Sequence, residues 1–192
     1  MAKRRVCSYA ARMGSPRDAV SFRPLCRDDF PLLQRWLGAP HVAAWWRQPL
    51  SLEEVHAKYG PRVEDAEPTH VFMIDHGPRP AGWIQWYRWA DYPDHARQLG
   101  AEPQTAGLDL AIGEPDLTGR GLGSGAIGRF LREIVFADPA LTAVVADPEE
   151  ANKSSLRAFA RNGLTVTNTV QLAGEDFSRC VVRRGRFPSD SL

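Results

Sequence analysis

The chain has 192 residues, with 24 Lys and Arg against 23 Asp and Glu, so its formal net charge is +1 at pH 7. This length favours one domain with its own core. The balanced charge argues against a nucleic-acid-binding protein, and no apolar run approaches the roughly 20 residues of a membrane helix. Three scattered cysteines, Cys7, Cys26 and Cys180, lack metal-ligand spacing and indicate reduced thiols in a cytoplasmic protein.

Residues 1–20 differ from the rest of the chain. They are rich in basic and small residues, and no apolar stretch follows Arg5, so the pattern of a signal peptide is incomplete. We therefore expect a disordered basic tail followed by one domain over residues 21–192. A tail that docks on an anionic partner is the alternative.

The remaining sequence alternates between strand and helix patterns. The first half predicts a strand over residues 20–25, helices over 28–38 and 51–60, and strands over 70–75 and 81–91. In the first helix, Phe30, Leu33 and Leu37 share a face. The second opens with the capping box of Ser51 and Glu54.

The second half begins with an irregular polar stretch, expected between residues 91 and 105. It then predicts a strand over residues 107–113, a helix over 123–136, a strand over 141–147, a helix over 152–163, and a hairpin over 165–172 and 178–187. This order indicates one mixed α/β domain.

Three tryptophans lie on one predicted strand. Side chains alternate across a strand, so Trp83 and Trp89 share a face with Gln85 and Tyr87, while Trp86 faces the other way. We expect most of these rings to lie in the core.

The loop "LTGRGLGSG", residues 117–125, places four glycines and Arg120 between a strand and a helix. Free N–H groups and the helix dipole at such a junction suit a phosphate group, which glycines allow to approach closely. The loop has no lysine for a nucleotide P-loop, and it does not follow the first strand, as a dinucleotide loop would. A tight turn that binds nothing is the alternative.

The segment "GLDLAIGEPDLTGRGLGSGAIGRFL", residues 107–131, resembles motif A of the GNAT acetyltransferases. Gly121 and Gly123 match its two small positions, and Thr118 departs from its Gln or Arg position. With "HVAAWW" and "ADPEEANKSSLRAFARNGL", residues 22–184 resemble aminoglycoside 6′-N-acetyltransferases. The resemblance implies a single α/β (α+β) GNAT domain. Its mixed, mostly antiparallel sheet would be splayed at the central strand and flanked by helices.

The family also implies acetyl-CoA as cosubstrate and no metal. The pantetheine arm would pair with the central strand at Leu110, Ala111 and Ile112. The pyrophosphate would rest on the loop residues Thr118, Gly119, Arg120, Gly121, Leu122, Gly123 and Ser124. Asn152 falls where family members commonly have an asparagine near the pantetheine.

Asp109 is the candidate proton acceptor. An acidic residue inside the apolar strand "GLDLAIG" is unfavourable without a purpose, and the family places its key aspartate there. Phe159 falls where GNAT enzymes usually have the tyrosine that protonates the leaving thiolate, and phenylalanine has no donor. The alternatives are that water or another hydroxyl protonates the thiolate, or that the thiolate leaves without a proton.

The resemblance implies a polycationic small-molecule substrate, without nucleic acid or membrane, and a monomer or homodimer. Acidic candidates for its site are Asp91, Asp94, Asp109, Asp147, Glu149 and Asp176, with Glu102 and Glu114 as weaker members. Trp45 and Trp46 follow a helix end and a proline-bearing link. One of them, with Trp46 favoured, is expected to line the cleft, because aromatic faces hold sugars and cations. The five histidines suggest no metal site and receive no role.

Two other functions stay open. Enzymes that acylate hydroxylysine-type siderophore precursors are similar around the "HVAAWW" stretch and the loop, but they tend to carry a histidine where this chain has Asp109. An acyl-CoA-binding sensor without catalysis is the other, and Phe159 is the feature that favours it.

Overall fold

Seven strands form one sheet in the order β1-β2-β3-β4-β5-β7-β6 in the computed structural model, which describes residues 20–47 and 51–188. The strands are β1 (Val20–Pro24), β2 (His70–His76), β3 (Arg79–Arg88), β4 (Thr105–Ile112), β5 (Ala143–Ala146), β6 (Thr165–Leu172) and β7 (Glu175–Arg183). The helices are α1 (Phe30–Leu37), α2 (Pro40–Trp46), α3 (Leu52–Val63), α4 (Pro93–Leu99), α5 (Leu122–Phe130) and α6 (Lys153–Ala160). The predicted tail lies outside the described residues, except that Val20 already belongs to β1.

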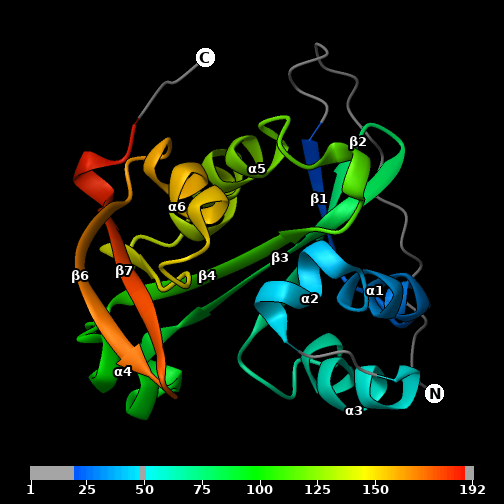
Figure 1. The fold of residues 1–192 in the computed structure, drawn as a ribbon. Helices are drawn as coiled ribbons and strands as arrows, with labels where there is room; N and C mark the ends of the chain where they lie inside the picture. The colour runs from blue at the N-terminus through cyan, green and yellow to red at the C-terminus, as the bar shows by residue number, and fades with distance from the viewer. Residues whose placement is uncertain (1–19, 48–50, 189–192) are drawn as a thin grey trace.

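The sheet is mixed and mostly antiparallel, as predicted. Only β4 and β5 run parallel among the paired strands of the described chain, and the other neighbours are antiparallel. Helices α5 and α6 cover one face, and α1, α2 and α3 gather on the other (Figure 1). The fold is therefore a single layered α/β domain.

The tryptophans of β3 divide between the two faces, as their alternation predicts. Trp83 is fully buried under α1 and α3, whereas Trp86 packs against the core beneath α5 and α6. Trp89 lies beyond the end of β3 in a 3₁₀ turn and joins a third cluster with Ala96 and Val145, which holds α4 against the sheet. The predicted strand end at residue 91 is therefore wrong, and the face that Trp89 was expected to share with Trp83 does not extend to it.

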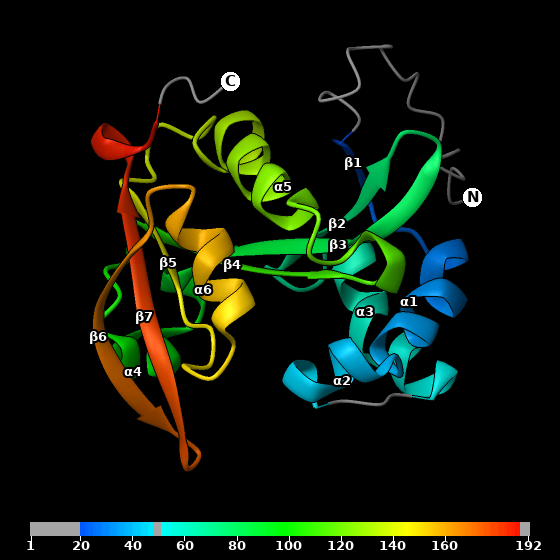
Figure 2. The same ribbon diagram turned by 45° about the horizontal axis from the view of Figure 1, so that its top comes forward.

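The central strand separates from its neighbour, as the family resemblance implies. Pairing between β4 and β5 covers Thr105, Ala106 and Gly107, although β4 continues to Ile112. Beyond Gly107, β4 keeps its partner β3, and β5 leads away toward α6. In Figure 2 the β6–β7 hairpin curves away on one side and α1 to α3 gather on the other, with β3 and β4 crossing between them. The opening between β4 and β5 positions the site described below.

Several predicted boundaries differ from the structure. Helix α2 was not predicted, and α4 lies in the stretch that was expected to be irregular. Both helices begin with proline at their first position, Pro40 and Pro93. Proline is tolerated there because the first N–H of a helix has no partner within it. Similarly, α3 was expected to end at Gly60 but continues through Pro61 to Val63.

Candidate active site

A cavity of about 290 Å³ opens where β4 separates from β5. Most of its lining comes from α2, the middle of β4, and the segment from the end of β5 into α6, while β3, α4 and β7 contribute one residue each. The lining residues are Trp45, Trp46, Tyr87, His95, Leu108, Asp109, Leu110, Asp147, Pro148, Glu149, Asn152, Ser155, Phe159 and Phe177. Acidic and aromatic side chains therefore face the same space.

Asp109 lies on the splayed part of β4, where its side chain lines this pocket. Its Oδ2 accepts a hydrogen bond of 2.9 Å from Nε2 of Gln85 on β3. The amide of Gln85 is itself oriented, because its Oε1 accepts from Nη1 of Arg62 at 3.2 Å. The carboxylate is thus held in one orientation from the α3 side of the sheet.

Burial is the main reason that the pKa of Asp109 rises to about 6. The negative charge of Asp147 adds to this rise, whereas the Gln85 hydrogen bond and the charges of His95 and Arg62 oppose it. A carboxyl with this pKa is largely ionised at neutral pH and is more basic than an ordinary aspartate. It is suited to accept a proton from an amine bound beside it.

Asp147 supplies the second carboxylate of the pocket, directly after β5. Its side chain is 12% exposed, and its Oδ2 accepts a hydrogen bond of 3.2 Å from Nε2 of His95, whose side chain is 45% exposed. The His95 ring also meets Trp89 edge to face, with 5.1 Å between centroids. Asp147 is thus partly buried and accepts a hydrogen bond from an imidazole that is charged only when it is protonated.

The part of the lining that α2 contributes is aromatic. Trp46 packs against Trp83 at 5.0 Å between ring centroids, which fixes its ring beside the pocket, and Trp45 lies next to it. After α2, Arg47 donates hydrogen bonds to Glu149 at 2.8 Å and to Glu175 at 2.9 Å. Helix α2 is thereby tied to the opposite wall.

Phe159 is buried and lines the pocket from α6. The position at which the resemblance implies a tyrosine therefore faces the pocket without a hydroxyl group. Ser155 lies one helical turn earlier and lines the same pocket. Asn152 begins α6: its Oδ1 accepts a hydrogen bond from the Ser155 N–H at 3.0 Å. This contact gives Asn152 a capping role, and its expected contact with pantetheine stays a prediction.

The glycine loop offers an open cradle at the N-terminus of α5. Gly119 and Gly121 have φ values of +71° and +86°, which only glycine adopts easily, and a Cβ at either position would meet nothing within 4 Å. Because Gly121 precedes the helix, no side chain caps its first turn. The loop therefore has room and unshared N–H groups that suit a phosphate group.

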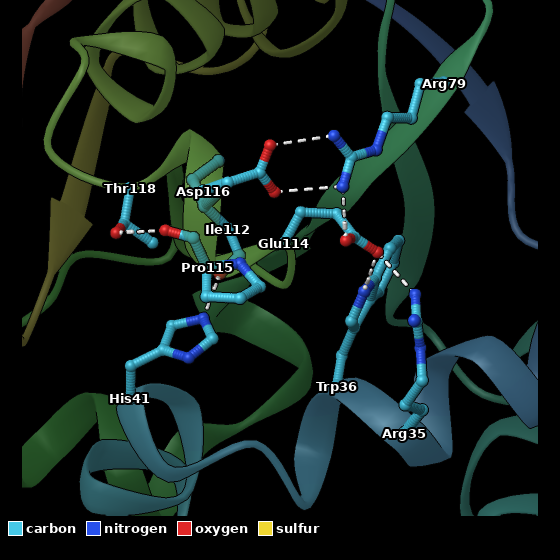
Figure 3. Close-up of polar contacts among 9 residues, drawn as sticks. All are labelled: Arg35, Trp36, His41, Arg79, Ile112, Glu114, Pro115, Asp116 and Thr118. Atoms are coloured by element: carbon cyan, nitrogen blue, oxygen red, sulfur yellow. Dashed lines mark hydrogen bonds and ion pairs between the residues drawn. The ribbon is translucent and has the colours of Figure 1, made fainter.

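Glu114 anchors the beginning of this loop (Figure 3). Its Oε1 accepts from Trp36 Nε1 at 2.9 Å and from Arg35, and its Oε2 accepts from Arg79 Nη2 at 2.6 Å. Arg79 also binds both oxygens of Asp116 at 2.9 Å. Glu114, a weak candidate for the acidic site, instead ties the loop to α1 and to the β2–β3 turn.

Further contacts in the same region support the end of β4 and the loop (Figure 3). His41 on α2 donates from Nε2 to the carbonyl oxygen of Ile112 at 3.0 Å, and Thr118 donates to the carbonyl oxygen of Pro115 at 2.7 Å. These bonds connect α2 to the last residue of β4 and close the turn before the glycines. His41, which received no role from the sequence, thus has a structural one.

The structure brings together only some of the acidic candidates. Asp109, Asp147 and Glu149 line the pocket, as does Trp46. Asp91 is exposed in a turn and Asp94 is an exposed ion-pair partner of Arg97, and neither lines the pocket. Asp176 lines a second hollow, which Glu149 lines too.

Two polar lining residues, His95 and Ser155, were not among the candidates from the sequence, and Trp45 lines the pocket together with the favoured Trp46. His95 lies on α4, whose sequence signal is Pro93 at the start and Gly100, with φ of +63°, at the end. Among the described residues, no group of three or more His, Cys, Asp or Glu side chains is placed to hold a metal ion. Nor is any helix of residues 20–47 and 51–188 long and apolar enough to cross a membrane.

Comparison with known proteins agrees with this geometry. Residues 26–172 match the family model of the acetyltransferase (GNAT) domain. Aminoglycoside N(6′)-acetyltransferase type 1 of Klebsiella pneumoniae is 27% identical over 157 residues, which are 80% of this chain and 77% of that protein. The lysine N-acyltransferase MbtK of Mycolicibacterium paratuberculosis is 26% identical over 129 residues, covering 67% and 58%.

The solved structures lead to the same family. Aminoglycoside acetyltransferase AAC(6′)-Ib in complex with coenzyme A and kanamycin superimposes with a TM-score of 0.74 at 25% identity, over 87% of this chain and 96% of that one. The splayed strand, the open glycine loop and these matches agree with one another. This chain therefore belongs to the GNAT family of acetyltransferases, which use acetyl-CoA.

Proposed function

We propose that this protein transfers an acetyl group to the 6′-amine of an aminoglycoside and thereby confers resistance to that antibiotic. The observation that carries the proposal is the position of Asp109. Its carboxylate lies on the splayed part of β4, in a pocket that Asp147 and Glu149 also line. Such a pocket suits a small molecule with several ammonium groups, because Asp109 and Asp147 can each pair with one of them, whereas Glu149 is already paired with Arg47.

Acetyl-CoA, when bound, supplies the thioester whose acetyl carbon the amine attacks. The loop residues from Thr118 to Ser124 would hold its pyrophosphate, and Leu110, Ala111 and Ile112 would hold its pantetheine by strand-like pairing. Support for these assignments comes from the uncapped N-terminus of α5 and from the end of β4–β5 pairing at Gly107.

Asp109 would bind the substrate amine and accept its proton, since only the neutral amine is a nucleophile. Its pKa of about 6 lies close enough to neutrality for it to be ionised before the reaction and protonated after it. Asp147 would pair with a second ammonium group, and Trp46 would pack against a sugar ring. Asp176 in the adjacent hollow would contact a distant amine of a long substrate.

Asp91 and Asp94, which the sequence also suggested for substrate binding, are proposed to act only through their general negative charge. Both side chains are exposed, and Asp94 is paired with Arg97. Screening by salt limits the effect of such exposed charges.

Release of thiol from acetyl-CoA by the purified protein tests the proposal. The acceptors are kanamycin, tobramycin, N6-hydroxylysine and none, with an aminoglycoside that has a 6′-hydroxyl in place of the amine as a further control. We expect release with kanamycin and tobramycin and no release with the 6′-hydroxyl compound. Release with hydroxylysine alone would instead identify a siderophore-precursor enzyme, and acetyl-CoA binding without release from any acceptor would identify a sensor.

The variant Asp109→Asn is expected to lower turnover at least 100-fold while it leaves acetyl-CoA binding within about two-fold, because general-base catalysis contributes on the order of 10²–10⁴. Asp94→Asn is the matched control, because it removes the same charge at an exposed position outside the pocket. Normal turnover of Asp109→Asn would exclude Asp109 as the proton acceptor.

A further inference from the structure

His95 lines the pocket and is hydrogen-bonded to a carboxylate that lines it too. His95 donates from Nε2 to Oδ2 of Asp147 at 3.2 Å, and both side chains line the cavity. Because Nε2 carries the proton in this bond, Nδ1 is free to gain or lose the second one. The charge of this His–Asp pair therefore changes by one when the imidazole titrates.

The surroundings of His95 isolate this pair from other strong cations. Its ring packs against Trp89, which is fully buried and not ionisable. The ionisable groups that share the pocket with His95 are Tyr87, Asp109, Asp147 and Glu149. Those that flank it along the chain are Asp91 and Tyr92 before α4 and Asp94 and Arg97 on α4, and Arg179 of β7 contacts Gly100 after α4. Asp94 and Arg97 pair with each other, and Arg179 donates to the carbonyl oxygen of Gly100.

Two of these groups act on the titration of His95. The hydrogen bond to Asp147 is the largest cause that raises the pKa of His95 above its ordinary 6.5, followed by the charges of Asp147 and Asp109, while burial opposes them. Glu149, the third carboxylate of the pocket, is already paired with Arg47. Asp147 is therefore the carboxylate whose availability His95 controls.

We propose that His95 is a positioning residue that determines how strongly Asp147 binds the ammonium groups of the acceptor. This inference rests on the proposed function, because it assigns Asp147 to substrate binding. With a neutral His95, the Nε2–H orients the carboxylate and leaves its full negative charge for a substrate cation. With a protonated His95, the imidazolium neutralises Asp147 and repels the incoming ammonium group.

The sign of the effect follows from linkage. A cation bound at Asp147 disfavours the imidazolium, so binding lowers the pKa of His95. Reciprocally, protonation of His95 weakens the binding of the cation. Affinity for a polycationic acceptor should thus fall as the pH drops through the pKa of His95, in addition to any change from other groups.

Two variants distinguish the effect of the charge of His95 from the effect of its ring packing. His95→Gln keeps an amide donor within reach of Asp147 but cannot titrate. His95→Phe keeps a ring against Trp89 but has neither donor nor charge. Both variants are expected to lose the component of pH dependence that belongs to His95. A purely structural role of the ring would make His95→Phe behave like the native protein.

The first measurement is an NMR titration of His95, assigned by its absence from His95→Gln. We expect a pKa above 6.5 in the native protein. Asp147→Asn should lower it to an ordinary value or below, and so should saturating kanamycin. A His95 pKa that is unaffected by Asp147→Asn, or by kanamycin, would overturn the inference.

The second measurement is the dissociation constant of kanamycin by calorimetry at pH 6 and pH 8. The ratio of native to His95→Gln values should be close to one at pH 8 and roughly two- to five-fold at pH 6, as expected for one partly exposed charge interaction. Equal ratios at both pH values would overturn the inference, and so would the absence of kanamycin binding at both.

The outcomes for the two proposals are distinct. Acetylation of kanamycin with no effect of His95→Gln on its pH dependence removes the role of His95 and leaves the proposed function intact. A His95 pKa that falls when kanamycin binds, without any acetylation of kanamycin, supports the His95–Asp147 competition and removes the proposed function.

Discussion

Gln85 and Asp109 lie opposite each other on β3 and β4, and the side-chain amide of Gln85 donates to the Asp109 carboxylate at 2.9 Å. Gln85 is buried, with 7% of its surface exposed, so this bond is shielded from water. Arg62 binds the other end of the amide, which leaves the Nε2 donor facing Asp109. The register of two strands thus sets both the orientation and the basicity of the candidate proton acceptor.

The first prediction concerns this pair. Gln85→Leu removes a hydrogen bond that lowers the pKa of Asp109, so that pKa should rise above about 6. Since hydrogen bonds to charged groups contribute about 1.5–3 kcal/mol, we expect the acidic limb of the kcat/KM profile to move upward by roughly one pH unit or more. The pH dependence of thiol release measures this shift.

Gln98→Leu serves as the control, because Gln98 is exposed on α4 and does not line the pocket. It should leave the acidic limb in place. If Gln85→Leu also left the limb unchanged, Asp109 would not be the group that titrates in it.

Parts of the fold and site with strong local signals could be predicted from the sequence. Most strands follow from periodicity, and the capping box of Ser51 and Glu54 follows from a local motif. The splayed sheet and the position of Asp109 on its central strand follow from the family resemblance. The capping bonds are present: Glu54 N–H donates to Ser51 Oγ at 3.2 Å, and Ser51 N–H donates to Glu54 at 2.6 Å.

The features that could not be predicted from the sequence depend on contacts between segments that lie far apart in the chain. Helix α4 has seven residues, too few for a periodic pattern, and it is held by packing of Ala96 and Leu99 against Trp89. His95 faces the pocket only because of that packing. Glu114 was counted among acidic loop residues, since nothing local indicates that Arg35 and Arg79 converge on it from positions 79 and 35 residues away.

The second prediction concerns the point where β4 separates from β5. A Cβ at Gly107 would overlap the ring of Tyr87, whereas a Cβ at Gly125 would meet nothing within 4 Å. Gly107→Ala should therefore destabilise the protein by about 1–3 kcal/mol, as overpacking usually does. Gly125→Ala, the matched control within α5, should be neutral or stabilising by up to about 1 kcal/mol.

Chemical denaturation of both variants measures the free energy of unfolding. Equal stability of Gly107→Ala and the native protein would mean that Tyr87 does not occupy the place of the missing side chain. Because Tyr87 also lines the pocket, a shifted Tyr87 should in addition change the acceptor KM of Gly107→Ala.

The third prediction concerns Glu114. Burial by itself raises the pKa of this carboxyl, but hydrogen bonds from Trp36 and Arg79 and the charge of Arg35 lower it below its ordinary 4.5. Glu114→Gln keeps the shape and removes the charge. It should lower the free energy of unfolding by about 1–3 kcal/mol at pH 7 and raise the KM for acetyl-CoA, because the loop before α5 loses its anchor.

The pH dependence of this effect has a defined sign. A carboxyl whose pKa is lower in the folded state stabilises the fold above its unfolded pKa, and that stabilisation is lost as the pH falls through the folded pKa. The difference between the native protein and Glu114→Gln should therefore be full at pH 7 and shrink below pH 4.5. Glu133→Gln, at an exposed pair with Arg129, is the control and should change stability by less than about 0.5 kcal/mol. A constant difference from pH 7 to pH 3 would exclude an ionised Glu114.

The last prediction concerns the missing hydroxyl at Phe159. This side chain is 3% exposed and lines the pocket one turn after Ser155, so Phe159→Tyr would add a phenol at the position where GNAT enzymes usually have one. If protonation of the leaving thiolate limits turnover, the variant should be faster, and the gain should be larger for acyl donors with poorer leaving groups. If the thiolate leaves unassisted, kcat should stay equal, since a thiol with a pKa of about 8.5 is a good leaving group. Steady-state kcat with acetyl-CoA and with a donor of higher thiol pKa distinguishes the two.

Ser155→Ala then tests the hydroxyl that the pocket already has. A loss of rate in the native background that Phe159→Tyr restores would identify Ser155 as the proton donor, directly or through water. An unchanged rate would exclude Ser155 as the donor.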